Sequence, residues 1–448
     1  MRFIPNGPGT RREMLAQLGL RDLEALFASI PSAARLGRDL SIPAGMSEPE
    51  HVDWFRALAA RNRGATFSAF LGAGSYPHFI PLVADSLIQR AEFFTSYTPY
   101  QPEISQGTLQ AIFEFQTFIT LLTGMEVANA SVYDGASATA EAVLMADRLA
   151  KGRPRALLAE SLHPYYRRVV DSHTANLEIR PETLPLGGAS GRLDPAALAA
   201  ALGPDVSCVV VQQPNFFGVV EDLAPLAREA HRAGALLVVV VTEALSLAQL
   251  KAPGALGADL VVGEAQSFGV PVSYGGPYLG FMAARRGHVR QLPGRIAGQT
   301  LDAEGRRGYV LTLATREQHI RREKATSNIC TNENLVLMQA LMYLTLMGAE
   351  GLRTVAAHNV SLLAYLLGRL PPGFRPAFSG PRFNEVTLAC PRPAAEIVRG
   401  AIARGIVPGV DLGRFFPAHA DKLLVAVTET KDRAALDRLV AVLGEAAR

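Results

Sequence analysis

The sequence predicts an α/β protein with a mostly parallel sheet covered by helices on both sides, followed by a smaller α+β unit. Short β-branched runs alternate with amphipathic helices between about residues 105 and 290. One run, residues 235–241, is continuously apolar, which is typical of a strand buried on both faces. With 448 residues, 49% of them hydrophobic, the chain is long enough for two or three domains and a large core.

The order of the expected elements divides the chain into three parts. Residues 1–65 are expected to form a helical arm that lies against another surface, with capping boxes beginning at Thr10 and Ser47. Residues 66–330 are expected to form the large α/β domain, with helices over 106–122, 134–149 and 223–233, and strands over 206–212, 235–241, 259–263 and 278–283. Residues 331–448 are expected to form the small α+β domain, with helices over 335–347 and 350–370, a strand over 383–389, a helix ending near 405, a strand over 422–428 and a closing helix.

Composition excludes several classes of function. The formal net charge is only +3 and is spread along the chain, so nothing indicates a nucleic acid or an anionic membrane as a partner. No apolar run approaches the ~20 residues of a membrane span, and the beginning of the chain does not read as a signal peptide. The three cysteines, Cys208, Cys330 and Cys390, are too far apart for a metal cluster or a disulfide framework. We expect a soluble cytoplasmic protein without a metal.

Two small-residue motifs could approach a ligand. Residues 129–141 (NASVYDGASATAE) place Asp134 before a helix, where exposed N–H groups and the Ser137 hydroxyl could seat a phosphate, although plain packing would explain the same residues. Residues 70–78 (FLGAGSYPH) do not follow a strand and open a helix, so a dinucleotide-binding loop is excluded. Their glycines more simply let the arm cross closely over the main domain. His78 could reach a site, but a hydrogen-bonded structural histidine is the better interpretation.

Five longer segments resemble one family. They are YTPYQPEISQGTLQAIFEFQT (97–117), NASVYDGASATAEA (129–142), QQPNFFGVVEDL (212–223), GEAQSFGVPVSYGGPYLGF (263–281) and REQHIRREKATSNICTN (316–332). Together they closely resemble the glycine decarboxylase P-protein family of the glycine cleavage system, in its two-subunit form, with the match to subunit 1. This resemblance implies a fold-type I pyridoxal phosphate (PLP) transferase architecture. It also implies an enzyme that releases the carboxyl group of glycine as CO2 and passes the aminomethyl group to the lipoyl arm of H-protein, with PLP as electron sink.

The resemblance also implies where a cofactor pocket would lie. Complete family members carry the Schiff-base lysine between a strand ending in Asp-Leu-Val-Val and a Ser/Thr-Phe pair, and this chain has Gln266 there. An amide nitrogen forms no imine. Glu243 stands at the acidic position and His163 where a ring-stacking residue is expected, beside the seat at Ser137. We therefore expect a degenerate pocket, with PLP bound by the partner subunit 2 rather than by this chain.

The implied partners are subunit 2 in an α2β2 heterotetramer, lipoylated H-protein and the substrate glycine. Residues 95–103 are the best candidate for a loop lent to the partner's active site, because two prolines stiffen it and Tyr97, Tyr100 and Gln101 offer directed hydroxyl and amide groups. Interface packing would explain the tyrosines equally well. The charged run 316–324 predicts a solvated helix face with a Glu317–Arg321 pair, or an intersubunit or lipoyl-domain surface that uses Arg321 or Arg322.

Two other functions stay open. The chain could be a self-sufficient PLP-dependent amino acid decarboxylase or lyase that uses another lysine, for which Lys251 and Lys324 are the candidates. It could also be a regulatory pseudoenzyme without a catalytic partnership.

Overall fold

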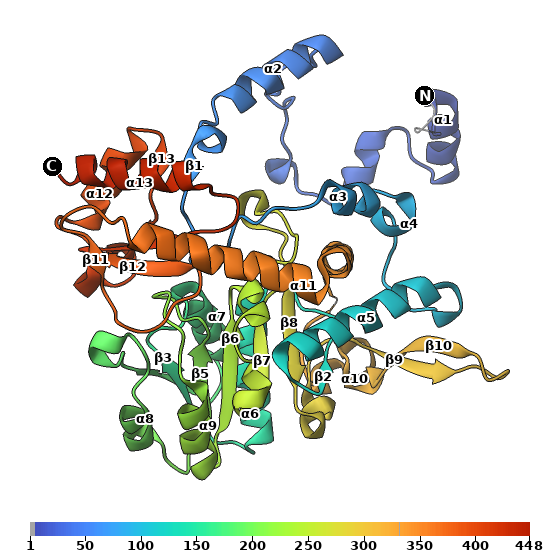
Figure 1. The fold of residues 1–448 in the computed structure, drawn as a ribbon. Coiled ribbons are helices and arrows are strands. Elements are labelled where there is room, and N and C mark those ends of the chain that lie inside the picture. The colour runs from blue at the N-terminus through green and yellow to red at the C-terminus, as the bar shows by residue number, and fades with distance from the viewer. Residues whose placement is uncertain (1–4, 331) are drawn as a thin grey trace. The chain divides into compact units, whose positions relative to one another are not determined.

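The computed structural model describes residues 5–330 and 332–448 (Figure 1). The chain forms two compact units, Met1–Ala65 and Thr66–Arg448. The further division of the second unit into a large and a small domain stays a prediction, and residue 331, where the small domain was expected to begin, lies outside the described residues.

Thirteen helices and fifteen strands are present in the described part of the chain, besides short 3-10 turns. The helices are α1 (Pro8–Gln17), α2 (Glu48–Ala60), α3 (Leu82–Ile88), α4 (Ala91–Phe94), α5 (Gln106–Thr123), α6 (Gly135–Leu149), α7 (Pro164–Thr174), α8 (Pro195–Ala201), α9 (Leu223–Arg232), α10 (Gln318–Arg321), α11 (Asn334–Leu367), α12 (Ala394–Ile402) and α13 (Arg433–Ala446). The strands are β1 (Ser68–Ala69), β2 (Val127–Ala128), β3 (Arg155–Ala159), β4 (Arg180–Leu184), β5 (Val206–Gln212), β6 (Leu236–Val241), β7 (Leu260–Glu264), β8 (Gly280–Ala284), β9 (Ile296–Leu301), β10 (Arg307–Thr312), β11 (Arg375–Pro376), β12 (Glu385–Ala389), β13 (Ile406–Val407), β14 (Val410–Asp411) and β15 (Lys422–Ala426).

The seven-stranded sheet is the centre of the second unit. Its strand order is β2-β8-β7-β6-β5-β3-β4 (Figure 1). The neighbours from β7 through β4 are parallel, whereas β8 runs antiparallel to both β7 and β2. In the register of the middle strands, Val239 pairs with Val211 on one side and Val261 on the other. A mostly parallel sheet confirms the fold class that the alternation of strands and helices predicted.

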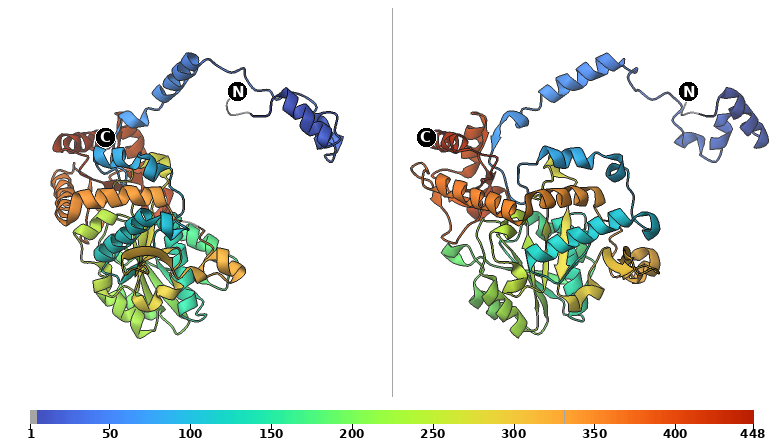
Figure 2. Two further views of the ribbon diagram at one scale, coloured as in Figure 1. Left: turned by 90° about the vertical axis from the view of Figure 1, so that its right-hand side faces the viewer. Right: turned by 45° about the vertical axis from the view of Figure 1, so that its right-hand side comes forward.

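Helices cover both faces of this sheet, which explains why the strands read as unbroken apolar runs. Val239 and Val241 of β6 point into the core built with α5, α9 and α11. Their neighbours Val238 and Val240 point into the opposite core, built with α6 and α7. Successive side chains of a strand alternate between faces, so both sets must be apolar when both faces are buried. Helices α5 and α11 pack against each other on the same side (Figure 2).

The C-terminal part carries a second, four-stranded antiparallel sheet with the order β11-β12-β15-β14. Its core includes Val386 and Leu423, together with Leu439 of α13 and Leu363 of α11. Helix α11 is interrupted at Gly348, whose backbone is not helical, so it divides where two separate helices were predicted. By length and composition it is the one described helix that could cross a membrane. This is weak evidence, because its N-terminal half packs in the core with α5.

The first unit contains α1 and α2. The predicted capping box at Ser47 is confirmed, since Glu50 accepts hydrogen bonds from the Ser47 backbone and hydroxyl. The capping box predicted at Thr10 is wrong. Helix α1 begins earlier, at Pro8 after Gly7, because the fixed φ and missing N–H of proline suit the first helical turn. Which surface this unit lies against stays a prediction.

Candidate functional site

The site forms where the parallel strands β5, β6 and β7 end. Glu243 follows β6 by two residues and Gln266 follows β7 by two, so both lie at the carboxyl edge of the sheet. His163 is the N-cap residue of α7, which follows the neighbouring strand β3. In open parallel sheets ligands bind at this edge. All three side chains are buried, and each contacts one chain segment, Gly72–His78, which we call the pocket-filling segment.

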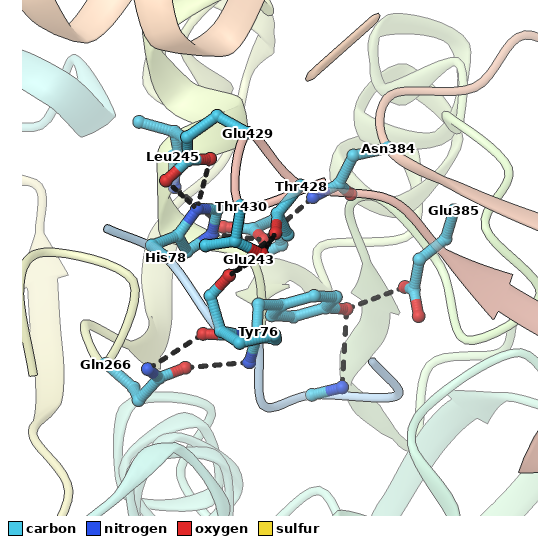
Figure 3. Close-up of polar contacts among 12 residues, drawn as sticks. Tyr76, His78, Glu243, Leu245, Gln266, Asn384, Glu385, Thr428, Glu429 and Thr430 are labelled. Carbon is cyan, nitrogen blue, oxygen red and sulfur yellow. Dashed lines mark hydrogen bonds and ion pairs between the residues drawn. The ribbon is translucent and has the colours of Figure 1, made fainter. Parts of the chain in front are cut away.

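Gln266 holds the middle of the pocket-filling segment (Figure 3). Its Oε1 accepts a hydrogen bond from the Tyr76 backbone N–H at 2.8 Å, and its Nε2 donates to the Tyr76 carbonyl at 3.0 Å. The Nε2 also donates to the carbonyl of Val270 at 2.7 Å. The side chain therefore uses both its acceptor and its two donors within the chain, and it pairs with Tyr76 as a neighbouring strand would.

His163 holds the beginning of the pocket-filling segment. Its Nδ1 accepts a hydrogen bond from the Tyr165 backbone N–H, so the ring hydrogen lies on Nε2, which donates to the Ala73 carbonyl at 2.8 Å. Burial lowers the pKa of His163 to about 4. The ring is therefore neutral, and it lies 4.8 Å from the ring of Tyr166 and 4.9 Å from that of Phe216, between centroids.

Glu243 holds the end of the pocket-filling segment. Its Oε2 lies 3.1 Å from His78 Nε2 and accepts a hydrogen bond from Asn384, while its Oε1 accepts from the Leu245 backbone N–H. On the other side of the imidazole, His78 Nδ1 lies 2.9 Å from Glu429 Oε2. Burial alone would lower the pKa of His78, but the two carboxylates outweigh it and raise that pKa to about 10. His78 is thus an imidazolium between two glutamates.

The phosphate seat predicted at the start of α6 is used by side chains of the protein itself. Asp134 caps the helix and accepts a hydrogen bond from the Ser137 N–H at 2.7 Å. Glu264, at the end of β7, accepts from the Gly135 N–H at 3.0 Å and from the Leu279 N–H at 2.8 Å. Burial raises the pKa of Glu264 to about 7. The side chains of Glu264 and Asp134 therefore occupy two of the N–H groups at the helix start that an anion would use.

The C-terminal sheet also binds the pocket-filling segment, through Glu385. Glu385 of β12 accepts hydrogen bonds from the Tyr76 hydroxyl at 2.6 Å and from the Ala73 N–H at 2.7 Å. The approach is so close that a Cβ on Gly72 would lie 2.3 Å from Glu385 Oε1, and one on Gly74 would lie 2.9 Å from the His163 ring. The two glycines therefore allow a close approach within the second unit, whereas the crossing of residues 1–65 over the main domain stays a prediction.

This arrangement does not fit pyridoxal phosphate. The position that would need a lysine holds an amide already bonded to Tyr76, and the acidic position is paired with His78. The helix N-terminus that would hold the phosphate carries a buried carboxylate instead. Elsewhere, Lys251 and Lys324 are exposed, and neither takes part in these hydrogen bonds. Among the described residues, no group of three His, Cys, Asp or Glu side chains could hold a metal ion.

The predicted loop at residues 95–103 makes a different set of contacts. Tyr97 is 81% exposed and Tyr100 51% exposed, and the Gln101 side chain is also on the surface. The Tyr100 hydroxyl accepts a hydrogen bond from Arg295 Nη2 at 3.0 Å. Sequence reasoning missed Arg295, because no motif accompanies it.

The charged run 316–324 is only partly helical. Helix α10 covers four residues, and Arg322 has a positive φ of 53°. The expected Glu317–Arg321 pair is wrong, because the Glu317 side chain is buried and faces Arg295, with Oε2 3.8 Å from Arg295 Nε, and His319. Arg321 and Arg322 are exposed, so a surface role for them stays a prediction.

Comparisons with known proteins agree with one another. The family described as glycine cleavage system P-protein matches residues 1–443. Probable glycine dehydrogenase (decarboxylating) subunit 1 of Anaeromyxobacter dehalogenans is 51% identical, covering 96% of each chain, and that of Methylocella silvestris is 50% identical, covering 97% of this chain and 98% of the other. A crystal structure of glycine decarboxylase (P-protein), in inhibitor-bound form, matches with a TM-score of 0.88 and 44% identity over 100% of both chains.

More distant solved structures show the fold alone. Sphingosine-1-phosphate lyase of Burkholderia pseudomallei matches with a TM-score of 0.66 at 16% identity, covering 93% of this chain and 94% of the other. These likenesses confirm the fold-type I PLP-transferase architecture that the five sequence segments implied.

Proposed function

This chain belongs to the P-protein family of the glycine cleavage system, and from that premise we propose that it serves as subunit 1 of a two-chain glycine dehydrogenase (decarboxylating). The relatives named as subunit 1 of that enzyme match this chain over almost its whole length. A subunit 1 requires a subunit 2, with which this chain forms an α2β2 heterotetramer. The complex works in the cytoplasm, releases the carboxyl group of glycine as CO2 and passes the aminomethyl group to the lipoyl group of H-protein.

In this proposal PLP is bound by subunit 2. The observation that carries it is the pocket-filling segment, because Gln266, Glu243, His163 and the Gly135 N–H are already bonded within the chain at the edge of the sheet where a cofactor would bind. PLP supplies the electron sink for decarboxylation when bound. This chain contributes a folded surface and a loop to the partner's active site.

The self-sufficient enzyme is the second candidate, with Lys251 or Lys324 as its amine. Both side chains are exposed, whereas a Schiff-base lysine has to be held beside an enclosed cofactor. The geometry of this chain therefore favours the two-subunit enzyme.

Reconstitution tests the proposal. With lipoylated H-protein present throughout, this chain alone is expected to show no visible absorbance from a PLP–lysine adduct and no exchange of the glycine carboxyl group with labelled bicarbonate. Adding subunit 2 is expected to produce both. Exchange by this chain alone would instead identify a self-sufficient enzyme, and full activity of subunit 2 without this chain would identify a regulatory pseudoenzyme.

The proposal includes residues 95–103 as the loop lent to subunit 2. Tyr97, Tyr100 and Gln101 are exposed on it, with Pro99 and Pro102 limiting its conformations. Exposed tyrosines and an amide can orient a small substrate without adding charge.

Replacing Tyr97 or Tyr100 by phenylalanine tests the loop. Each substitution removes one hydroxyl and leaves the ring, so the heterotetramer should still assemble. Glycine turnover at low glycine concentration is expected to fall by roughly tenfold or more, as for loss of a hydrogen bond to a charged group. Size-exclusion chromatography and the exchange assay measure the two effects separately. Unchanged kinetics in both variants would assign the tyrosines to packing.

A further inference from the structure

The buried Arg295 contacts the exposed Tyr100 of the loop. The arginine is only 2% exposed, whereas half of the tyrosine side chain faces outward. Its Nη2 donates a hydrogen bond to the Tyr100 hydroxyl at 3.0 Å, and its guanidinium carbon lies 5.2 Å from the centre of the Tyr100 ring. The pair therefore has both a directed hydrogen bond and a cation–π contact.

Burial and neighbouring residues limit the movement of this arginine, whose Nε has no hydrogen-bond partner among the described residues. Its carbonyl accepts a hydrogen bond from the Ala130 N–H at 2.7 Å, which ties it to the chain just before α6. Glu317 Oε2 lies 3.8 Å from Arg295 Nε, and Asn332 Oδ1 lies 3.5 Å from Nη1. A buried arginine paired in this way has little rotational freedom, so the group that it holds is preorganised as well.

The direction of the hydrogen bond determines what Tyr100 can do next. Because the guanidinium has only donors, the Tyr100 oxygen must accept from it, and the hydroxyl hydrogen points away from Arg295. The Tyr100 hydroxyl donates to no other described residue. It is thus an oriented donor at the surface, and a carboxylate is the acceptor that best suits it.

We propose that Arg295 is a positioning residue that aims the Tyr100 hydroxyl at the carboxylate of glycine in the active site of subunit 2. This inference rests on the proposed function, and it adds which loop side chain meets the substrate, through which atom, and what holds it there. Tyr97 has no such anchor among the residues that the structure describes.

Steady-state kinetics of the purified heterotetramer test the inference. Arg295→Gln is expected to raise KM for glycine on the order of tenfold while kcat changes by less than about threefold, because a hydrogen bond to the carboxylate contributes to binding and not to breaking the C–C bond. Arg295→Lys keeps a cationic donor, so its KM is expected to lie between those of the wild type and Arg295→Gln. The double variant Arg295→Gln/Tyr100→Phe is expected to have the KM of Tyr100→Phe, because the arginine acts through the hydroxyl.

A matched control separates positioning from stability. Arg167 is partly buried, and it donates a hydrogen bond to the Ala159 carbonyl, far along the chain from the loop. Arg167→Gln should lower the melting temperature without raising KM for glycine. The inference is overturned if Arg295→Gln and Arg167→Gln change KM alike, if the effects of Arg295→Gln and Tyr100→Phe add, or if Tyr100→Phe leaves KM unchanged. An inactive wild-type heterotetramer would instead contradict the proposed function itself.

Discussion

Replacing His78 by glutamine is expected to lower the free energy of unfolding by about 3–5 kcal/mol, the cost of removing one partner from a buried ion pair. His78 lies between Glu243 and Glu429, and all three side chains are buried or nearly so. Glutamine cannot supply the positive charge, so two carboxylates are left facing each other in the interior. Burial raises the pKa values of the nearby Tyr76 and Tyr343, so both phenols stay neutral and add no charge to the cluster.

The wild-type protein should show the same effect as a pH dependence. The pKa of His78 rises from its ordinary value of 6.5 to about 10 on folding. The folded state therefore binds this proton more tightly than the unfolded state does. Its stabilising contribution is complete below pH 6.5 and is lost as the pH rises through about 10.

Urea unfolding at several pH values measures both expectations. The difference in unfolding free energy between wild type and His78→Gln should be largest near pH 6.5 and shrink toward pH 10. Taking the difference cancels the titrating groups that do not contact His78, which leaves His78 and its partners Glu243 and Glu429. His173→Gln, at an exposed histidine on α7, is the matched control and should change stability by less than about 0.5 kcal/mol. A difference that does not depend on pH would show that His78 is neutral in the folded protein.

Replacing Gln266 by lysine is expected to destabilise the chain by about 2–4 kcal/mol and still not create a PLP site. The ammonium cannot accept the hydrogen bond from the Tyr76 N–H, and it introduces a charge at a buried position. The substitution also removes neither of the other two obstacles to cofactor binding. His163 still holds the pocket-filling segment, and Glu264 still accepts the hydrogen bond from the Gly135 N–H at the helix start. If the missing amine were the only obstacle, this variant would gain a PLP–lysine adduct.

Gln266→Met separates the two parts of this expectation. Methionine has a similar volume but none of the three hydrogen bonds, so it measures their loss without the added charge. Thermal unfolding is expected to rank the chains in the order wild type, Gln266→Met and Gln266→Lys. Equal stability of Gln266→Lys and wild type would show that the segment is held elsewhere.

The strands of the central sheet show how much of the fold the sequence predicted. Strand β5 was predicted with its observed bounds and β6 within one residue. Both are apolar, β-branched runs between turn residues, a pattern that is typical of a strand buried on both faces. Strand β3, Arg155–Ala159, was not predicted, since its Ala and Leu side chains fit a helix equally well. The ribbon β9–β10 was also missed, because alanine, glycine and glutamine in β9 dilute its pattern.

The location of the site could be predicted from the sequence, but the residues that contact its side chains could not. The family resemblance located Gln266, Glu243 and His163 at one edge of the sheet, and the structure brings them together. What fills the space between them is 190 residues from Gln266 along the chain, and the carboxylates of Glu385 and Glu429 are more than 300 residues from the segment that they bind. Such pairings arise only from the packing of the whole chain, and local patterns carry no signal of them.

Reduction of the assembled heterotetramer with borohydride identifies the chain that binds PLP. The complex is incubated with PLP, reduced, digested, and each chain is mapped by mass spectrometry for phosphopyridoxyl-lysine. The label is expected on a single lysine of subunit 2 and on no lysine of this chain, in the wild type and in Gln266→Lys alike. Specific, stoichiometric label on any lysine of this chain would show that this chain binds the cofactor itself, contrary to the proposed division between the subunits.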